Sequence, residues 1–339
     1  MNKKRKLLNL RLISGAFGLL LFVILIYKIG PKIIIENFLK IGWWFFVTCL
    51  IAFGWIFLQS LAWALIQTAF QPVPLLTLFR AKVMADGFNT LLPTANMGGE
   101  AARAVIIKKH SPLKEGIPGI VFDKTIEYVS SIIYLTTGLF LSLLFLKVPA
   151  SLKIPSLIVL SASTIFTFIL IFLQFKGVHK ILSKIASIIP RAKNWLMEKE
   201  ELLHQFDSNM RLLFHHSRLK LVAALGLHLI SRLLGAMEIW VIIRAIGLPA
   251  NLIKVIYISI FVIIMNTAFF LIPGQWGAAE GANLLAAITV GYPASVGLTI
   301  GIVRRARKIF FAALTILLIL VTKEKIKLKK ASESEKLKP

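Results

Sequence analysis

The chain has 339 residues, of which 57% are hydrophobic, and it carries a formal net charge of +25. Soluble domains are about 45–50% apolar, so this composition excludes an ordinary water-soluble domain and indicates an all-α, polytopic membrane protein. The Lys and Arg residues cluster beside apolar segments, as they do in cytoplasmic loops and near anionic headgroups, so nucleic acid is not the expected partner.

Six apolar segments have the length needed to cross a bilayer, which is about 20 residues. They lie at about 12–30, 43–66, 119–146, 155–175, 221–246 and 294–322. We interpret the first as a retained span, because no small-residue cleavage site follows its basic start. Cys49 is the only cysteine, which excludes an intramolecular disulfide.

Two further apolar regions, 75–107 and 252–290, are each interrupted near the middle by proline and glycine. Proline removes a backbone donor and displaces the carbonyl four residues earlier, while glycine permits tight turns. Each region therefore predicts a broken, re-entrant hairpin, which is tolerated at membrane depth only where it is buried or lines a wet cavity. The predicted turn residues are Asn89, Pro93, Gly98, Gly99, Pro273, Gly274 and Gly277.

The elements follow the same order in both halves of the chain: span, span, broken hairpin, span. Each half crosses the membrane an odd number of times, so we expect an inverted repeat, an architecture found in secondary transporters. Residues 1–150 form the first predicted repeat and 151–322 the second, followed by a disordered basic tail at 323–339.

The segment 176–220 holds nine Lys/Arg residues against four acidic residues, and it is expected to be amphipathic. A helix on an anionic membrane surface and a solvated charged helix both fit this pattern. Placing this segment and both termini in the cytoplasm puts the densest basic segments on one side of the cell membrane.

Two acidic residues, Glu100 and Glu280, each lie seven residues after a hairpin proline, where the next helix begins. An ionisable residue inside a membrane is a functional candidate. About 24 residues after each of them comes a charged cluster: Asp123, Lys124 and Glu127 in the first half, and Arg304, Arg305, Arg307 and Lys308 in the second.

The second cluster is expected at membrane depth. The 14 residues from Lys308 to Val321 span only about 21 Å as a helix, less than the ~30 Å hydrocarbon core. Such cations need a cavity, a carboxylate such as Glu280, or a bound phosphate. An arginine guanidinium can bind a phosphate through two parallel N–H···O hydrogen bonds.

The span at 221–246 contains His228 and Arg232 one helical turn apart, followed by Glu238. A transport lining and a buried polar network both explain these residues, and the sequence leaves the two interpretations open. We treat them, together with Asp123, Lys124 and Glu127, as secondary site candidates.

One motif of the first half resembles the pattern of the lysylphosphatidylglycerol synthase/flippase transmembrane family. It runs from Asn89 through Pro93 to Gly98-Gly99-Glu100 and Arg103. Four motifs of the second half are similar to those of the family's hopanoid-biosynthesis-associated, flippase-like members. They are Ile272-Pro273-Gly274, Trp276-Gly277, Glu280-Gly281 and Arg304-Arg305-Ala306-Arg307. The resemblance covers nearly the whole chain. It departs from the family pattern at Asp123-Lys124, where Glu-Arg is expected. It implies the lipid-translocating part without the soluble aminoacyl-transferring domain.

Three functions remain open at this stage. The first is a flippase or scramblase-like transporter that moves an anionic or polyprenyl-linked lipid headgroup between the hairpins. Its headgroup-binding residues would be Arg304, Arg305, Arg307, Glu280, Glu100 and Arg103.

The second function is a membrane transferase that acts on a lipid phosphate. The case for this function is weakened because no metal or nucleotide motif occurs in the sequence. The third is an accessory subunit that docks a soluble lipid-modifying enzyme through 176–220. No metal or cofactor is expected, membrane lipids are the expected partners, and a homo-oligomer is left open.

Overall fold

The computed structural model describes residues 27, 31–91, 98–177, 190–269, 275 and 277–335. Within these ranges the chain forms eleven helices and no strand, as the composition predicts for an all-α membrane protein. Four of the described helices are long and apolar enough to cross a membrane. These four are α3 (Trp44–Gln67), α6 (Leu113–Phe145), α7 (Ala150–Lys176) and α10 (Arg218–Ala245).

These four helices correspond to predicted spans, whereas the predicted span 12–30 lies outside the described residues. The predicted span 294–322 is part of α13 (Ala294–Glu335), whose N-terminal half carries the basic Arg304–Lys308 cluster. Within the region predicted to be a disordered tail, 323–339, the backbone of α13 is helical as far as Glu335, and the last four residues lie outside the described part of the chain. The sequence contains no glycine or proline from 302 to 338, so no residue type in that segment breaks the helix.

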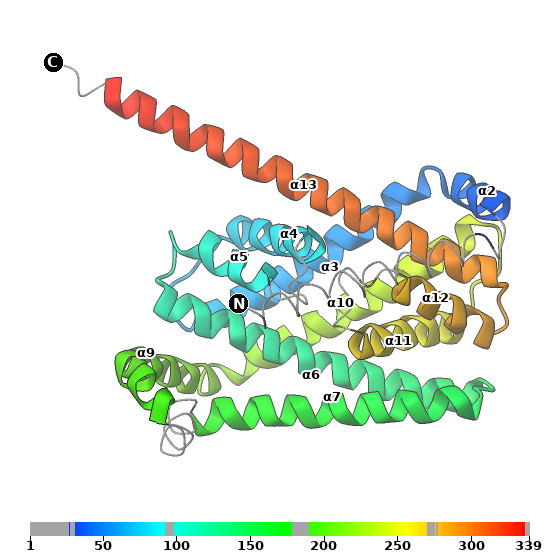
Figure 1. The fold of residues 1–339 in the computed structure, drawn as a ribbon, viewed down its shortest axis with the longest axis horizontal. Coiled ribbons are helices and arrows are strands. Elements are labelled where there is room, and N and C mark those ends of the chain that lie inside the picture. Colours follow the sequence, from blue (N-terminus) through cyan, green and yellow to red (C-terminus); the bar gives the residue numbers. More distant parts are fainter. Residues whose placement is uncertain are drawn as a thin grey trace.

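Both broken regions form helical hairpins. The first consists of α4 (Leu75–Leu91) and α5 (Gly98–Ile107), and the second of α11 (Leu252–Ala268) and α12 (Ala278–Thr289). In Figure 1 the α4–α5 hairpin lies toward the end of the bundle that carries α9 (Pro190–Phe214), and the α11–α12 hairpin lies toward the other end. Pro93, Pro273 and Gly274 lie outside the described residues.

The segment between the first two predicted spans is a helix and not a loop. This helix, α2 (Pro31–Ile41), packs Ile34 and Ile41 into the protein. Asn37 donates a hydrogen bond from Nδ2 to Oγ1 of Thr299 at 3.3 Å, which ties α2 to the start of α13. The sequence analysis missed it because it searched for segments long enough to cross a bilayer, and this helix has only 11 residues.

Glycines allow the helices around the bundle centre to approach closely. A Cβ on Gly87 of α4 would lie 2.1 Å from Oγ1 of Thr315 on α13. A Cβ on Gly297 of α13 would lie 2.5 Å from the backbone oxygen of Asn283 on α12. Both hairpins therefore pack directly against α13, as small residues permit between membrane helices.

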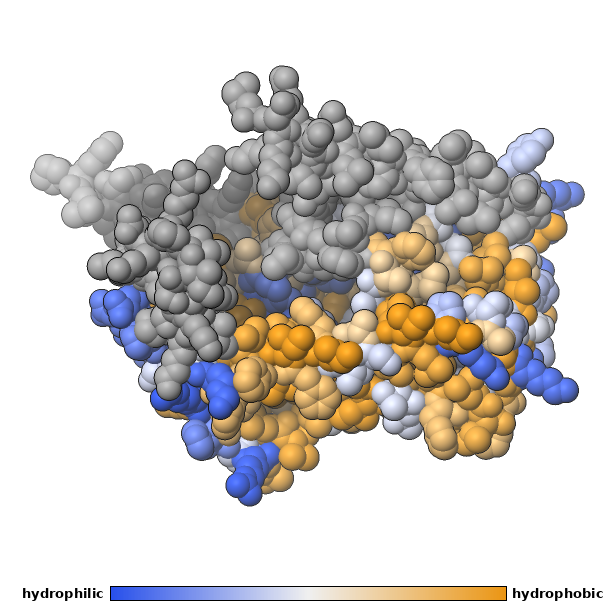
Figure 2. Space-filling model, turned by 60° about the horizontal axis from the view of Figure 1, so that its bottom comes forward, coloured by the Kyte–Doolittle hydropathy of each residue, from blue (hydrophilic) through white to orange (hydrophobic). Residues whose placement is uncertain are grey.

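The surface seen in Figure 2 carries a broad apolar band, with hydrophilic residues gathered at its two ends. Further hydrophilic residues are visible within a recess near the centre of this face. The exposed apolar side chains of α7, such as Phe166, Phe168 and Phe172, are typical of a lipid-facing helix.

Candidate functional site: two charged clusters around a cavity

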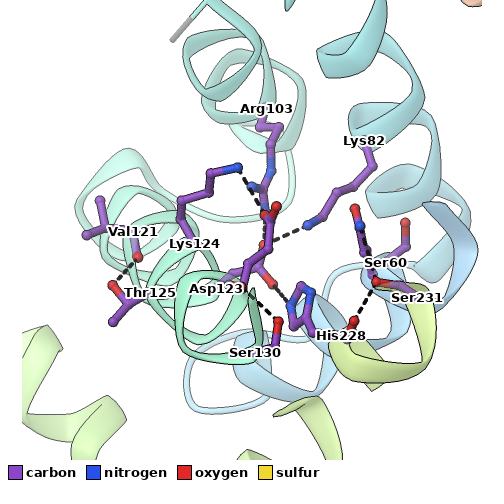
Figure 3. Close-up of polar contacts among 12 residues, drawn as sticks. Ser60, Lys82, Arg103, Val121, Asp123, Lys124, Thr125, Ser130, His228 and Ser231 are labelled. Carbon is purple, nitrogen blue, oxygen red and sulfur yellow. Dashed lines mark hydrogen bonds and ion pairs between the residues drawn. The ribbon is translucent and has the colours of Figure 1, made fainter. Parts of the chain in front are cut away.

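The first cluster is centred on Asp123 of α6, whose side chain is fully buried. Its Oδ2 accepts from Lys82 Nζ at 2.8 Å and from Arg103 Nη2 at 2.6 Å. Its Oδ1 lies 3.1 Å from Nε2 of His228, so side chains from α4, α5 and α10 converge on one carboxylate (Figure 3). A buried charge is tolerated when it is paired and hydrogen-bonded in this way.

The cluster continues toward a second carboxylate on α6. Glu127 accepts from Lys124 Nζ at 3.0 Å and from Arg232 Nη2 at 3.1 Å. Glu100 at the start of α5 binds Arg103 Nη1 at 2.7 Å and lies 3.5 Å from Lys124 Nζ. Arg103 therefore uses its fork to join two acids, which a lysine cannot do in the same geometry.

The α4–α5 hairpin is held in position by its own turn residues. The side-chain Oδ1 of Asn89 accepts from the backbone nitrogen of Gly99 at 2.8 Å, which caps the start of α5. A Cβ on Gly99 would lie 2.5 Å from the backbone oxygen of Ala85. Glycine is required here because α5 approaches the backbone of α4 so closely, and this approach brings Glu100 and Arg103 to the cluster.

The second cluster joins α13 to α10 and α12. Glu238 of α10 is fully buried and accepts from Arg304 Nε at 3.0 Å and from Arg307 Nε at 2.6 Å. Glu280 accepts from Arg305 Nε and also from the backbone nitrogen of Gly277 at 2.9 Å. Glu280 thus caps α12 and binds an arginine at the same time.

Two tryptophans of α3 connect the clusters. The guanidinium of Arg103 lies 4.0 Å from the ring centroid of Trp63, and that of Arg307 lies 4.6 Å from the ring centroid of Trp55. A cation over an indole face is stabilised by the ring quadrupole, most strongly where water is excluded. The same helix therefore supports one arginine of each cluster.

A cavity of about 280 Å³ lies between the clusters and is lined by residues from seven helices. Its basic lining residues outnumber the acidic ones by five to three. The basic residues are Lys82, Arg103, Lys124, Arg232 and Arg304, and the acidic residues are Asp86, Glu100 and Glu127. A cavity with this lining can hold an anion that one or more arginine forks bind in two-point geometry.

The sequence-predicted site residues separate into two groups in the structure. Arg304, Glu100, Arg103 and three secondary candidates (Lys124, Glu127 and Arg232) line the cavity, as does Asn89. The other predicted residues lie behind the lining and contact it or each other: Asp123, His228, Glu238, Glu280, Arg305 and Arg307. Gly98 is the first residue of α5, and Gly277 is the N-cap of α12.

Two charged cavity residues, both on α4, were missed because the sequence analysis used this segment only for its hairpin. Neither Lys82 nor Asp86 was among the predicted site residues. Together with Asn89 they lie at intervals of four and three residues, which places them on one face of a helix. A polar stripe with this spacing in an apolar segment could have indicated a cavity lining.

These observations define a multi-pass, all-α membrane protein with a charged cavity inside its helix bundle. The family model of the lysylphosphatidylglycerol synthase TM region matches residues 11–315, and the chain belongs to this family. Neither the curated proteins nor the solved structures include a match to the chain.

Proposed function

We propose that the protein is a lipid transporter, a flippase or scramblase, and not an enzyme. It moves the headgroup of a phospholipid or a polyprenyl-linked lipid through the cavity while the acyl chains stay in the bilayer. The observation that carries this proposal is the excess of basic over acidic side chains in a cavity within a membrane-spanning bundle. Such an excess favours a phosphate-bearing headgroup, which is anionic.

Within this proposal the arginines of α13 have different tasks. Arg304 reaches the cavity and binds the headgroup, together with Arg103 and Glu100 of α5. Arg307 shares Glu238 with Arg304 and so fixes the position of that carboxylate. The pair of Arg305 and Glu280 holds α12 against α13 and positions the hairpin that borders the cavity.

The arrangement of the hairpins supports an inverted repeat in which each half contributes one of them. The α4–α5 and α11–α12 hairpins lie toward opposite ends of the bundle (Figure 1), as alternating access to a central site requires. We further propose that the end carrying α9 and the C-terminal end of α13 faces the cytoplasm, because the basic segments gather there.

The test is lipid movement in proteoliposomes that contain acyl-labelled fluorescent phosphatidylglycerol, with dithionite quenching from outside as the readout. Arg304→Lys keeps the charge but loses the fork, so we expect the rate to fall about tenfold, equivalent to roughly 1.4 kcal/mol. The matched control is Arg244→Lys, at an exposed arginine outside the cavity lining. A wild-type rate in the Arg304→Ala protein would refute the headgroup site.

A further inference from the structure

The ion pairs of the first cluster form a row in which cations and acids alternate. Each neighbouring pair lies within 3.5 Å, in the order Lys82, Asp123, Arg103, Glu100, Lys124, Glu127, Arg232. Because a cation stands at both ends, the row carries one surplus positive charge. His228 also contacts Asp123, but its buried Nδ1 has no acceptor within the described residues, so the ring is neutral and adds no charge.

The second cluster contains a shorter row of the same kind. Glu238 lies between Arg304 and Arg307 and binds both of them. This row also begins and ends with a cation, so it too carries one surplus positive charge. The cavity therefore lies between two ion-pair rows that each have one cation more than they have acids.

The other charged groups near the cavity cancel in pairs. Arg305 binds Glu280, and Asp86, the remaining acid of the lining, attracts Lys308 of α13. The two hairpin segments 92–97 and 270–276 contain no acidic residue, and neither do residues 1–30. The surplus of two positive charges is therefore not removed by any acid of these segments.

The ends of the rows are turned to the cavity. Lys82, Arg232 and Arg304 each stand at the end of a row, and all three line the cavity. Each binds one acid of its row, whereas Arg103 and Lys124 inside the first row bind two. Lysine has three N–H donors and arginine has five, so the row ends have more donors than one ion pair uses. A phosphomonoester presents three acceptor oxygens and nearly two negative charges to such donors.

We propose that the cavity selects a headgroup phosphate with two negative charges, as in a phosphomonoester or a pyrophosphate diester, over a singly charged phosphodiester. A dianion balances the surplus charge of both rows. A phosphodiester balances one and leaves the other cation uncompensated in a low-dielectric interior, so it is the weaker ligand. This inference rests on the proposed headgroup site and names the charge class of its ligand.

The test compares two lipids that differ by one methyl group and one charge. At about pH 8 dihexanoyl-phosphatidic acid carries nearly two negative charges, whereas the phosphodiester dihexanoyl-phosphatidylmethanol carries one. Titration calorimetry of the full-length protein in a non-ionic detergent gives both dissociation constants. We expect the wild-type protein to bind the phosphatidic acid about tenfold more tightly. Glycerol 3-phosphate, which has the same phosphate without acyl chains, should bind more weakly than the lipid.

Variants at the row ends identify the source of the selection. Arg232→Gln removes the surplus charge of the first row while Glu127 keeps Lys124 as a partner, so the preference should fall to about threefold or less. Arg232→Lys keeps the charge and should keep the preference. Arg244→Gln removes the same charge at an exposed position outside the lining and should keep it too. Arg304→Gln removes the surplus of the second row and should act as Arg232→Gln does, so the test does not depend on one variant.

The outcomes separate this inference from the proposed function. Equal affinities of the wild-type protein for the two lipids overturn the charge selection and leave the headgroup site standing. A tenfold preference that persists in folded Arg232→Gln and Arg304→Gln proteins overturns its assignment to the surplus cations. If none of the three probes binds, the headgroup site fails and the selection fails with it. If glycerol 3-phosphate binds as tightly as phosphatidic acid, the site takes free phosphate esters, and the proposed lipid transport is overturned.

Discussion

At the residue scale, the buried carboxylates each bind more than one group. Asp123 binds Lys82 and Arg103, and Glu238 binds Arg304 and Arg307. Removing one partner from such a group leaves an uncompensated charge in a low-dielectric interior, which costs more than an exposed pair contributes. The stability of the bundle is therefore expected to depend strongly on these acids.

Asp123→Asn tests this dependence. The amide has nearly the same shape but no charge, so Lys82 and Arg103 lose their shared counter-ion and the free energy of unfolding should fall by about 3–5 kcal/mol. Thermal unfolding in detergent is the measurement. Glu201→Gln makes the same kind of change at an exposed position of α9 and should leave the midpoint unchanged. An equal midpoint for Asp123→Asn and wild type would contradict the prediction.

At the element scale, the hairpins depend on close backbone approach at a few glycines. Gly99 lies under the Asn89 cap and against the backbone of α4, whereas a Cβ on Gly281 of α12 would meet nothing within 4 Å. Gly99 is next to Glu100, and Gly281 is next to Glu280, the corresponding acid of the second hairpin. Substitutions at these two glycines therefore compare equivalent places of the two hairpins.

We expect Gly99→Ala to displace α5 from α4, because the added Cβ would lie 2.5 Å from the backbone oxygen of Ala85, which cannot move alone. The cost should be about 1–3 kcal/mol, typical of overpacking, and lipid movement should fall because Arg103 leaves its position. Thermal unfolding and the proteoliposome assay measure the two effects. Gly281→Ala should keep wild-type stability, and a similar loss in both variants would point to a general effect of the substitution.

The sequence predicted both hairpins because proline and glycine interrupt long apolar runs, which is a local property of the chain. It also predicted Glu100, Arg103 and Arg304, which now line the cavity. It could not predict that Lys82 binds Asp123, because this pairing depends on how α4 packs against α6, 41 residues later. Side-chain partners across helices follow from packing, and periodicity within one helix does not determine them.

At the scale of the whole molecule, the orientation that we propose for the membrane rests on the distribution of basic segments. α9 and the C-terminal end of α13 lie at one end of the bundle, and α2 lies toward the other (Figure 1). With α9 in the cytoplasm, the positive-inside rule is satisfied and α2 faces the outside.

Cysteine labelling in intact cells tests this orientation. The native Cys49 is buried, so the wild-type protein is expected to stay unlabelled by an impermeant thiol reagent and serves as the control. We expect labelling of Lys40→Cys, which is exposed on α2, and no labelling of His204→Cys until the cells are permeabilised. The opposite pattern would reverse the membrane orientation and place the basic segments outside.

The two tryptophans of α3 also make the protein its own optical reporter. Indole emission responds to the electric field on the ring, and here one guanidinium lies over Trp63 and another over Trp55. When a ligand draws Arg103 away, the emission of Trp63 changes, whereas movement of Arg307 changes that of Trp55. The chain contains seven tryptophans, so the difference in emission between the wild-type protein and Trp63→Phe or Trp55→Phe protein isolates the signal of one cluster, and rearrangement there can be followed in time without an attached dye.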